Sequence, residues 1–82
     1  MAVYELSDKA LDDLDRLYEY GLLTFGLSQA DEYFEGLLER FQEIAEAPRL
    51  YPAVDHISEG YRLSIYRVHS IYFRITDSGV FI

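Results

Sequence analysis

Cysteine is absent from this 82-residue chain, which excludes a disulfide framework and any metal site built on thiolates. The two histidines, His56 and His69, do not match a recognised metal-ligand spacing. The segment GLSQA lacks the lysine that a phosphate-binding loop requires. We therefore expect no metal and no cofactor.

Long apolar runs are also missing, and the segment MAVYELSDKA does not follow the charged-then-apolar pattern of a secretory signal. Together with the lack of cysteine, these absences predict a cytoplasmic protein that does not bind a membrane. The length is that of one small domain over residues 1–82. Hydrophobic residues make up 50% of the chain, which is enough for a globular core.

Basic residues are few: there are 7, against 15 acidic residues, so the net charge is −8. Lys9 is the only lysine. Residues 1–47 carry 12 acids and 3 bases, whereas residues 48–82 carry 3 acids and 4 bases. Phosphate backbones repel such an anion at long range, so we expect no direct binding to nucleic acid.

Hydrophobic spacing predicts an α+β fold with the element order β-α-α-β-β-β. Alternation in VYEL, residues 3–6, indicates a short strand, and Ser7 is a favourable N-cap for a helix that ends at Gly26. SQAD, residues 28–31, has the spacing of a capping box and is expected to begin a second helix, which Pro48 ends. Two helices this close in sequence fold back as an antiparallel hairpin.

Beyond residue 60 the hydrophobic period changes from about 3.6 to about 2, which is typical of strands. Two strands are predicted on either side of a turn at residues 68–70, and a third follows the turn signature TDSG at residues 76–79. The apolar faces of both helices require a common partner. The expected architecture is therefore a helical hairpin packed on one face of a small antiparallel sheet.

The two strands around residues 68–70 each present an apolar and a polar face. The apolar side chains Leu63, Ile65, Ile71 and Phe73 are assigned to the core. The opposite face then displays arginine, tyrosine and histidine: Arg62, Tyr66, Tyr72 and Arg74, with Arg67 and His69 near the turn.

This arginine–tyrosine face is open to three interpretations. The first is that these side chains are simply solvated strand surface. The second is that they bind phosphate and transfer protons in a ribonuclease. The third is that they form a docking surface for an acidic protein segment. The enrichment of arginine and tyrosine at interface hot spots supports the third interpretation, and the sequence leaves all three open. A crease between the helices and the sheet suits an amphipathic helix, and Leu22, Leu23, Tyr33 and Leu37 are assigned to its partly exposed apolar positions.

Three segments together resemble the ParE branch of the RelE/ParE toxin superfamily, and they cover nearly the whole chain. They are YELSDKALDDLDRLYEYG, FGLSQADEYFEGLLERFQEIAEAPRLYP and GYRLSIYRVHSIYFRITDSGVFI. The likeness rests on the order and spacing of the FG-x-x-QA helix junction, the A-x-P exit from the second helix and the GYR…H-x-I-x-[FY]-R strand pair. It implies a RelE/ParE-like fold and the toxin of a type II toxin–antitoxin module, held inactive by its cognate antitoxin.

Within this superfamily the resemblance implies one of two targets. ParE-like members poison DNA gyrase, whereas RelE-like members cut messenger RNA on the ribosome and have several lysines and arginines around their site. The single lysine of this chain favours a gyrase inhibitor without catalytic residues; an endoribonuclease and a non-toxic protein-binding module are the alternatives. Family members continue the last strand into a basic, histidine-containing C-terminal segment, and we expect this chain, which ends at Ile82, to lack it.

Overall fold

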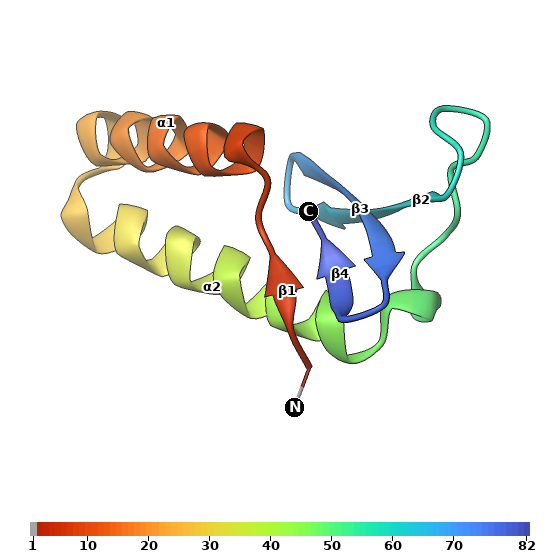
Figure 1. Ribbon diagram of the computed structural model, residues 1–82. Helices are drawn as coiled ribbons and strands as arrows, with labels where there is room; N and C mark the ends of the chain where they lie inside the picture. The colour runs from red at the N-terminus through yellow and green to blue at the C-terminus, as the bar shows by residue number, and fades with distance from the viewer. Residues whose placement is uncertain (1) are drawn as a thin grey trace.

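The computed structural model describes residues 2–82 and shows the predicted order β-α-α-β-β-β (Figure 1). Its elements are β1 (Tyr4–Glu5), α1 (Asp8–Phe25), α2 (Leu27–Glu46), a short 3-10 helix (Pro48–Leu50), β2 (Tyr61–Tyr66), β3 (His69–Thr76) and β4 (Gly79–Phe81). Over these residues, no helix has both the length and the apolar character that crossing a bilayer requires.

The four strands form one mixed sheet in the order β1-β4-β3-β2. Strands β2, β3 and β4 are antiparallel neighbours, as predicted. Strand β1 pairs in parallel with β4, with Tyr4 opposite Val80 and Glu5 opposite Phe81, so the first and last strands of the chain are adjacent. The α+β fold class and the helical hairpin are confirmed, and the parallel pair is the feature that the sequence did not reveal.

The helix ends follow local chemistry, with one correction. The Ser7 side chain caps α1 as predicted, because its Oγ accepts a hydrogen bond from the backbone N–H of Ala10 at 3.1 Å. The capping box at residues 28–31 is wrong. Gly26, with φ of 92°, ends α1 and also stands at the N-cap of α2, so Ser28 lies inside the second helix. A single glycine joins the helices, and no residue is left between them for a separate polar cap.

Helix α2 carries most of the core. Its buried side chains Leu37, Phe41, Ile44 and Ala45 lie in one cluster with Ile71, Phe73 and Val80 of the sheet. Helix α1 contributes only Leu14 to the buried set, and it packs along α2 as the other arm of the hairpin (Figure 1). Other apolar side chains of α1 are only partly covered: Leu11 is 48% exposed and Leu17 is half-buried.

The two faces of β2 are exchanged relative to the prediction. Ser64 is 2% exposed and lies opposite Ile71, whereas Ile65 is 61% exposed. The cause is the length of the turn. Tyr66 pairs with His69, so the turn contains two residues, whereas a turn at residues 68–70 contains three. A shift of one residue in register moves every side chain of a strand to the other face.

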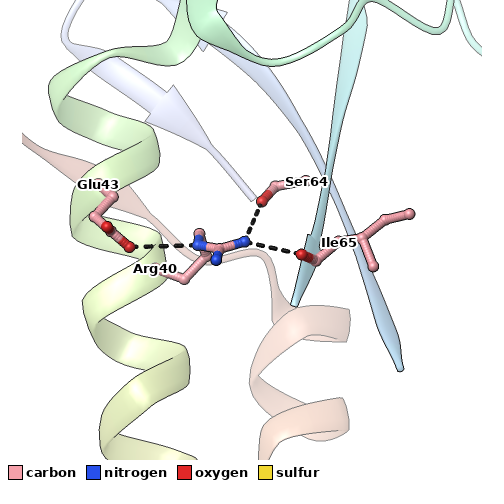
Figure 2. Close-up of polar contacts among 4 residues, drawn as sticks. All are labelled: Arg40, Glu43, Ser64 and Ile65. Atoms are coloured by element: carbon pink, nitrogen blue, oxygen red, sulfur yellow. Dashed lines mark hydrogen bonds and ion pairs between the residues drawn. The ribbon is translucent and has the colours of Figure 1, made fainter. Parts of the chain in front are cut away.

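A polar side chain from α2 makes the inward position of Ser64 possible. Arg40 donates from Nη1 to Ser64 Oγ at 3.0 Å and to the carbonyl oxygen of Ile65 at 2.9 Å (Figure 2). Its Nε donates to the Glu43 carboxylate at 3.3 Å, and its guanidinium lies 5.4 Å from the centre of the Tyr66 ring. The buried hydroxyl is thus satisfied, and β2 is attached to α2 by directional bonds.

Candidate functional site

A groove runs between the helical hairpin and the sheet, on the side that α1 leaves partly open. It consists of two adjoining hollows of about 550 Å³ and about 510 Å³. Leu17 of α1 and His69 of β3 line both hollows, so the two are neighbours. Helix α2 contributes residues to each of them, so it forms part of the groove along both hollows.

The first hollow lies between the far end of the helical hairpin and the β2–β3 turn. Its walls are largely apolar or aromatic, with Phe25, Ala30, Phe34 and Val68 among them. Polar groups also line it, among them Gln29, Glu32, Tyr33, Arg67 and His69. Apolar walls with a few polar groups are typical of a binding site.

The second hollow continues toward the end of the chain. Leu14, Leu37 and Phe41 of the helices contribute apolar surface, and Ile71 and Phe81 contribute it from the sheet. Lys9 and Asp13 on α1, together with Tyr72 on β3, also line this part. The whole groove is therefore apolar in its interior and carries charges of both signs.

Four polar and aromatic side chains gather beside the first hollow. Tyr33 Oη and His69 Nδ1 share a hydrogen bond of 2.5 Å. The Tyr33 and Tyr66 rings meet edge to face at 5.3 Å, and the Arg67 guanidinium lies 5.4 Å and 5.7 Å from the centres of these two rings. Gly36 of α2 leaves the space in which the Tyr66 hydroxyl lies, since a Cβ at position 36 would clash with it.

Two tyrosines that line the first hollow have raised pKa values. Burial raises the pKa of Tyr33, and Tyr66 acts in the same direction while the nearby Arg67 lowers it. Tyr18, which also lines the first hollow, donates a hydrogen bond of 2.6 Å to Asp31, and this bond to a carboxylate raises the tyrosine pKa. Both tyrosines therefore remain neutral hydrogen-bonding groups near pH 7.

Arg67 adopts an unusual backbone conformation, with φ of 55°. It is the only residue other than glycine with a positive φ among residues 2–82. An L-residue pays about 1–3 kcal/mol for this region of φ and ψ, and such strain is concentrated at functional positions. Within the same residues the Arg67 guanidinium has no hydrogen-bond acceptor and no ion-pair partner besides the two aromatic faces.

These groups are suited to noncovalent binding. An apolar groove between helices and a sheet can accept a helix or an extended segment, and the hydrogen-bonding groups along it can orient that segment. Across residues 2–82 no group of three or more His, Cys, Asp or Glu side chains is arranged to hold a metal ion.

Half of the ten site residues predicted from the sequence line the groove. These are Tyr33, Leu37, Arg67, His69 and Tyr72. Tyr66 lies directly behind them, against Tyr33 and Arg67. Leu37 is 3% exposed, so its assignment to a partly exposed position is wrong; it belongs to the buried core that also forms the wall of the groove.

The other four predicted residues lie outside both hollows. Arg62 is half-buried on the inner face of β2 and donates from Nη1 to the carbonyl oxygen of Tyr51 at 2.7 Å. Arg74 lies on the outer face, with its guanidinium 4.9 Å from the centre of the Phe81 ring. The single arginine–tyrosine face is therefore wrong, because the exchange of faces in β2 separates Arg62 and Tyr66 from Tyr72 and Arg74. Leu22 and Leu23 are exposed at the corner of the hairpin.

Sequence reasoning missed several residues of the groove and its support. Leu17 and Phe34 belong to the apolar stripes of the helices, which predict a buried core. Hydrophobic spacing does not distinguish a side chain inside the core from one that lines a groove. Arg40 was also missed. Its signal was available, since it is the only basic residue of α2 and adjoins the apolar stripe at Phe41.

Comparison with known proteins agrees with this architecture. The family described as "ParE toxin of type II toxin-antitoxin system, parDE" matches residues 4–82. Toxin ParE1 of Mycobacterium tuberculosis is 30% identical over 76 residues, which are 93% of this chain and 78% of that protein. Toxin ParE1 of Caulobacter vibrioides is 31% identical over 75 residues, which are 92% of this chain and 78% of that protein.

A solved structure extends the agreement to three dimensions. The structure described as "Chromosomal ParDE TA system from P. aeruginosa" contains a chain of the same fold, with a TM-score of 0.82 and 19% identity. The match covers 100% of this chain and 90% of the other. The sequence match over residues 4–82 and the identity to two ParE1 toxins show the family: this chain belongs to the ParE toxins of type II toxin–antitoxin systems.

Proposed function

We propose that this chain is a toxin that inhibits DNA gyrase by binding it, without catalysis, in the cytoplasm. A cognate antitoxin neutralises the toxin by placing an amphipathic segment in the groove between the helical hairpin and the sheet. The proposal involves no cofactor and no direct contact with nucleic acid. Membership in the ParE family supports the toxin assignment, and the solved structure with the same fold is that of a ParDE toxin–antitoxin system.

The groove formed by these two adjoining hollows is the observation that carries the antitoxin half of the proposal. Exposed apolar surface of this kind is costly in water and marks sites where another chain binds. Two adjoining hollows that share Leu17 and His69 suit the apolar face of a helix, whose anchor residues recur every three or four positions. A partner in this groove contacts α1, α2 and β3 at the same time.

Substitution of one exposed groove residue tests this placement. Val68 is 89% exposed and lines the first hollow, so Val68→Glu should leave the fold intact and place a charge where an apolar side chain docks. We expect the affinity for the antitoxin encoded beside the toxin gene to fall about tenfold or more, as measured by calorimetry. Leu50, which is 83% exposed and lies outside both hollows, provides the matched control Leu50→Glu. Equal effects of the two variants would contradict antitoxin binding in the groove.

The target is tested separately with purified components. DNA supercoiling by gyrase is measured with the chain ending at Ile82 and with a version that carries the C-terminal segment of a ParE relative, because we propose that this segment contributes to inhibition. Accumulation of cleaved DNA complexes, and its reversal by antitoxin, is the expected result. Unchanged supercoiling together with cleavage of messenger RNA on ribosomes would instead establish the endoribonuclease alternative. Absence of both activities, with antitoxin still bound, would leave a non-toxic binding module.

A further inference from the structure

Arg67 combines three properties that no other residue of the groove shares. Its backbone is held at φ of 55°, its guanidinium lies against the rings of Tyr33 and Tyr66, and its donors have no acceptor within residues 2–82. It also lines the first hollow next to the apolar Val68. A cation that lies over two aromatic rings and has free donors at the edge of an apolar surface is well placed to bind an anion.

We propose that Arg67 recognises a carboxylate of the segment that occupies the groove. This inference rests on the proposed function, since it assumes a bound protein segment. The first hollow takes a large apolar side chain, and an aspartate or glutamate about one helical turn away reaches the Arg67 guanidinium. The partner is thus an acidic amphipathic segment, and Arg67 determines which such segments bind.

Arg67 is a positive charge in a chain whose net charge is negative. The net charge is −8, and Glu32 also lines the first hollow, so long-range electrostatics disfavour any acidic partner. His69 lines the same hollow and shares its Nδ1 in a hydrogen bond with Tyr33. A preference for an acidic segment over a neutral one can therefore arise only from a short-range contact, and Arg67 is the only arginine or lysine that lines this hollow.

Because the backbone of Arg67 is strained, one substitution can distinguish recognition of a partner from a purely structural role of this residue. Asparagine adopts a positive φ more readily than arginine, so Arg67→Asn relieves strain while it removes the guanidinium. If Arg67 is retained for the fold, this variant loses stability through its lost contacts with two tyrosine rings. If Arg67 is retained for recognition, the variant keeps its stability and loses selectivity.

The test uses two synthetic helical peptides of equal length. One carries leucine along one face and glutamate beside it, and the other has glutamine in place of each glutamate. We expect the glutamate peptide to bind the wild-type chain about tenfold tighter, and Arg67→Asn to remove this preference. The melting temperature of Arg67→Asn should equal or exceed that of the wild type, or lie no more than about 3 °C below it. Arg49→Asn, an exposed change of equal charge outside the groove, should alter neither quantity.

Any other result contradicts the inference. Equal binding of both peptides, or a preference that persists in Arg67→Asn, shows that Arg67 does not recognise a carboxylate, while the groove remains a docking site. A large fall in melting temperature of Arg67→Asn assigns the residue to the fold. Failure of both peptides to bind also refutes the inference, and the proposed function then still stands or falls on the Val68→Glu measurement with the antitoxin.

Discussion

Arginine residues perform two different tasks in this chain, and their surroundings decide which. Arg40 and Arg62 are partly buried and donate hydrogen bonds to backbone or hydroxyl oxygens across elements. Arg67 is exposed, touches only aromatic faces and lines the groove. The first two arginines stabilise the fold, whereas the third is free to contact a partner.

Removal of Arg40 is predicted to destabilise the protein. Arg40→Ala leaves the buried Ser64 hydroxyl without its donor and removes both hydrogen bonds from Arg40 to β2 (Figure 2). We expect the free energy of unfolding, measured by urea denaturation, to fall by about 1–3 kcal/mol. Glu43→Ala is the control, because the Glu43 side chain is 63% exposed and its ion pair with Arg40 contributes less than about 1 kcal/mol. A loss in Arg40→Ala no larger than in Glu43→Ala would contradict this role.

Among the elements, the turns decide what faces the groove. The helix positions followed directly from hydrophobic spacing and from Ser7, Gly26 and Pro48, because helix signals are local. Hydrophobic spacing did not predict which side chains of β2 face the core, because this depends on whether the turn before His69 contains two residues or three. An arginine with positive φ takes the place that glycine or asparagine usually marks, so the turn carried no recognisable sequence signal.

The pairing of β1 with β4 depends on a glycine. Gly79 has φ of 152°, and a Cβ there would clash with the carbonyl oxygen of Val3, which accepts the hydrogen bond of Val80 N–H. Gly79→Ala should therefore reduce the free energy of unfolding by more than about 2 kcal/mol in urea denaturation. Gly60→Ala is the control, since Gly60 has φ of 81° with open space around its Cβ position and should cost only about 1 kcal/mol. Similar losses in both variants would show that the contact with Val3 can relax.

At the scale of the whole molecule, charge divides between the two layers. The helical half, residues 1–47, holds 12 of the 15 acidic residues, and one ion pair, Arg40 with Glu43, is formed among residues 2–82. Carboxylates spread along α1 and α2 therefore repel one another with little compensation. The groove lies beside this acidic layer, which makes the cations near it, Lys9 and Arg67, the local exceptions.

Salt should consequently stabilise the protein. Raising NaCl from about 10 mM to about 150 mM shortens the Debye length from about 30 Å to about 8 Å and screens the repulsion. We expect the free energy of unfolding to rise by about 1 kcal/mol in urea denaturation. In a variant with Asp12, Asp15 and Glu19 changed to amides, the free energy of unfolding at low salt should be higher and should rise less with NaCl. The reason is that these three exposed side chains of α1 no longer contribute to the repulsion. An unchanged or falling stability with salt would contradict net repulsion.

The sequence by itself determined the α+β class, both helices, the three C-terminal strands and the likeness to ParE toxins, because these depend on residues close together along the chain. It also identified Tyr33, Arg67, His69 and Tyr72, which line the groove. Only the tertiary structure decided that Arg62 and Arg74 lie on opposite faces of the sheet and that α1 leaves a groove open beside β3. The reason is physical: strand register and helix packing are set by contacts between distant residues, and a turn shorter by one residue exchanges the faces of a strand.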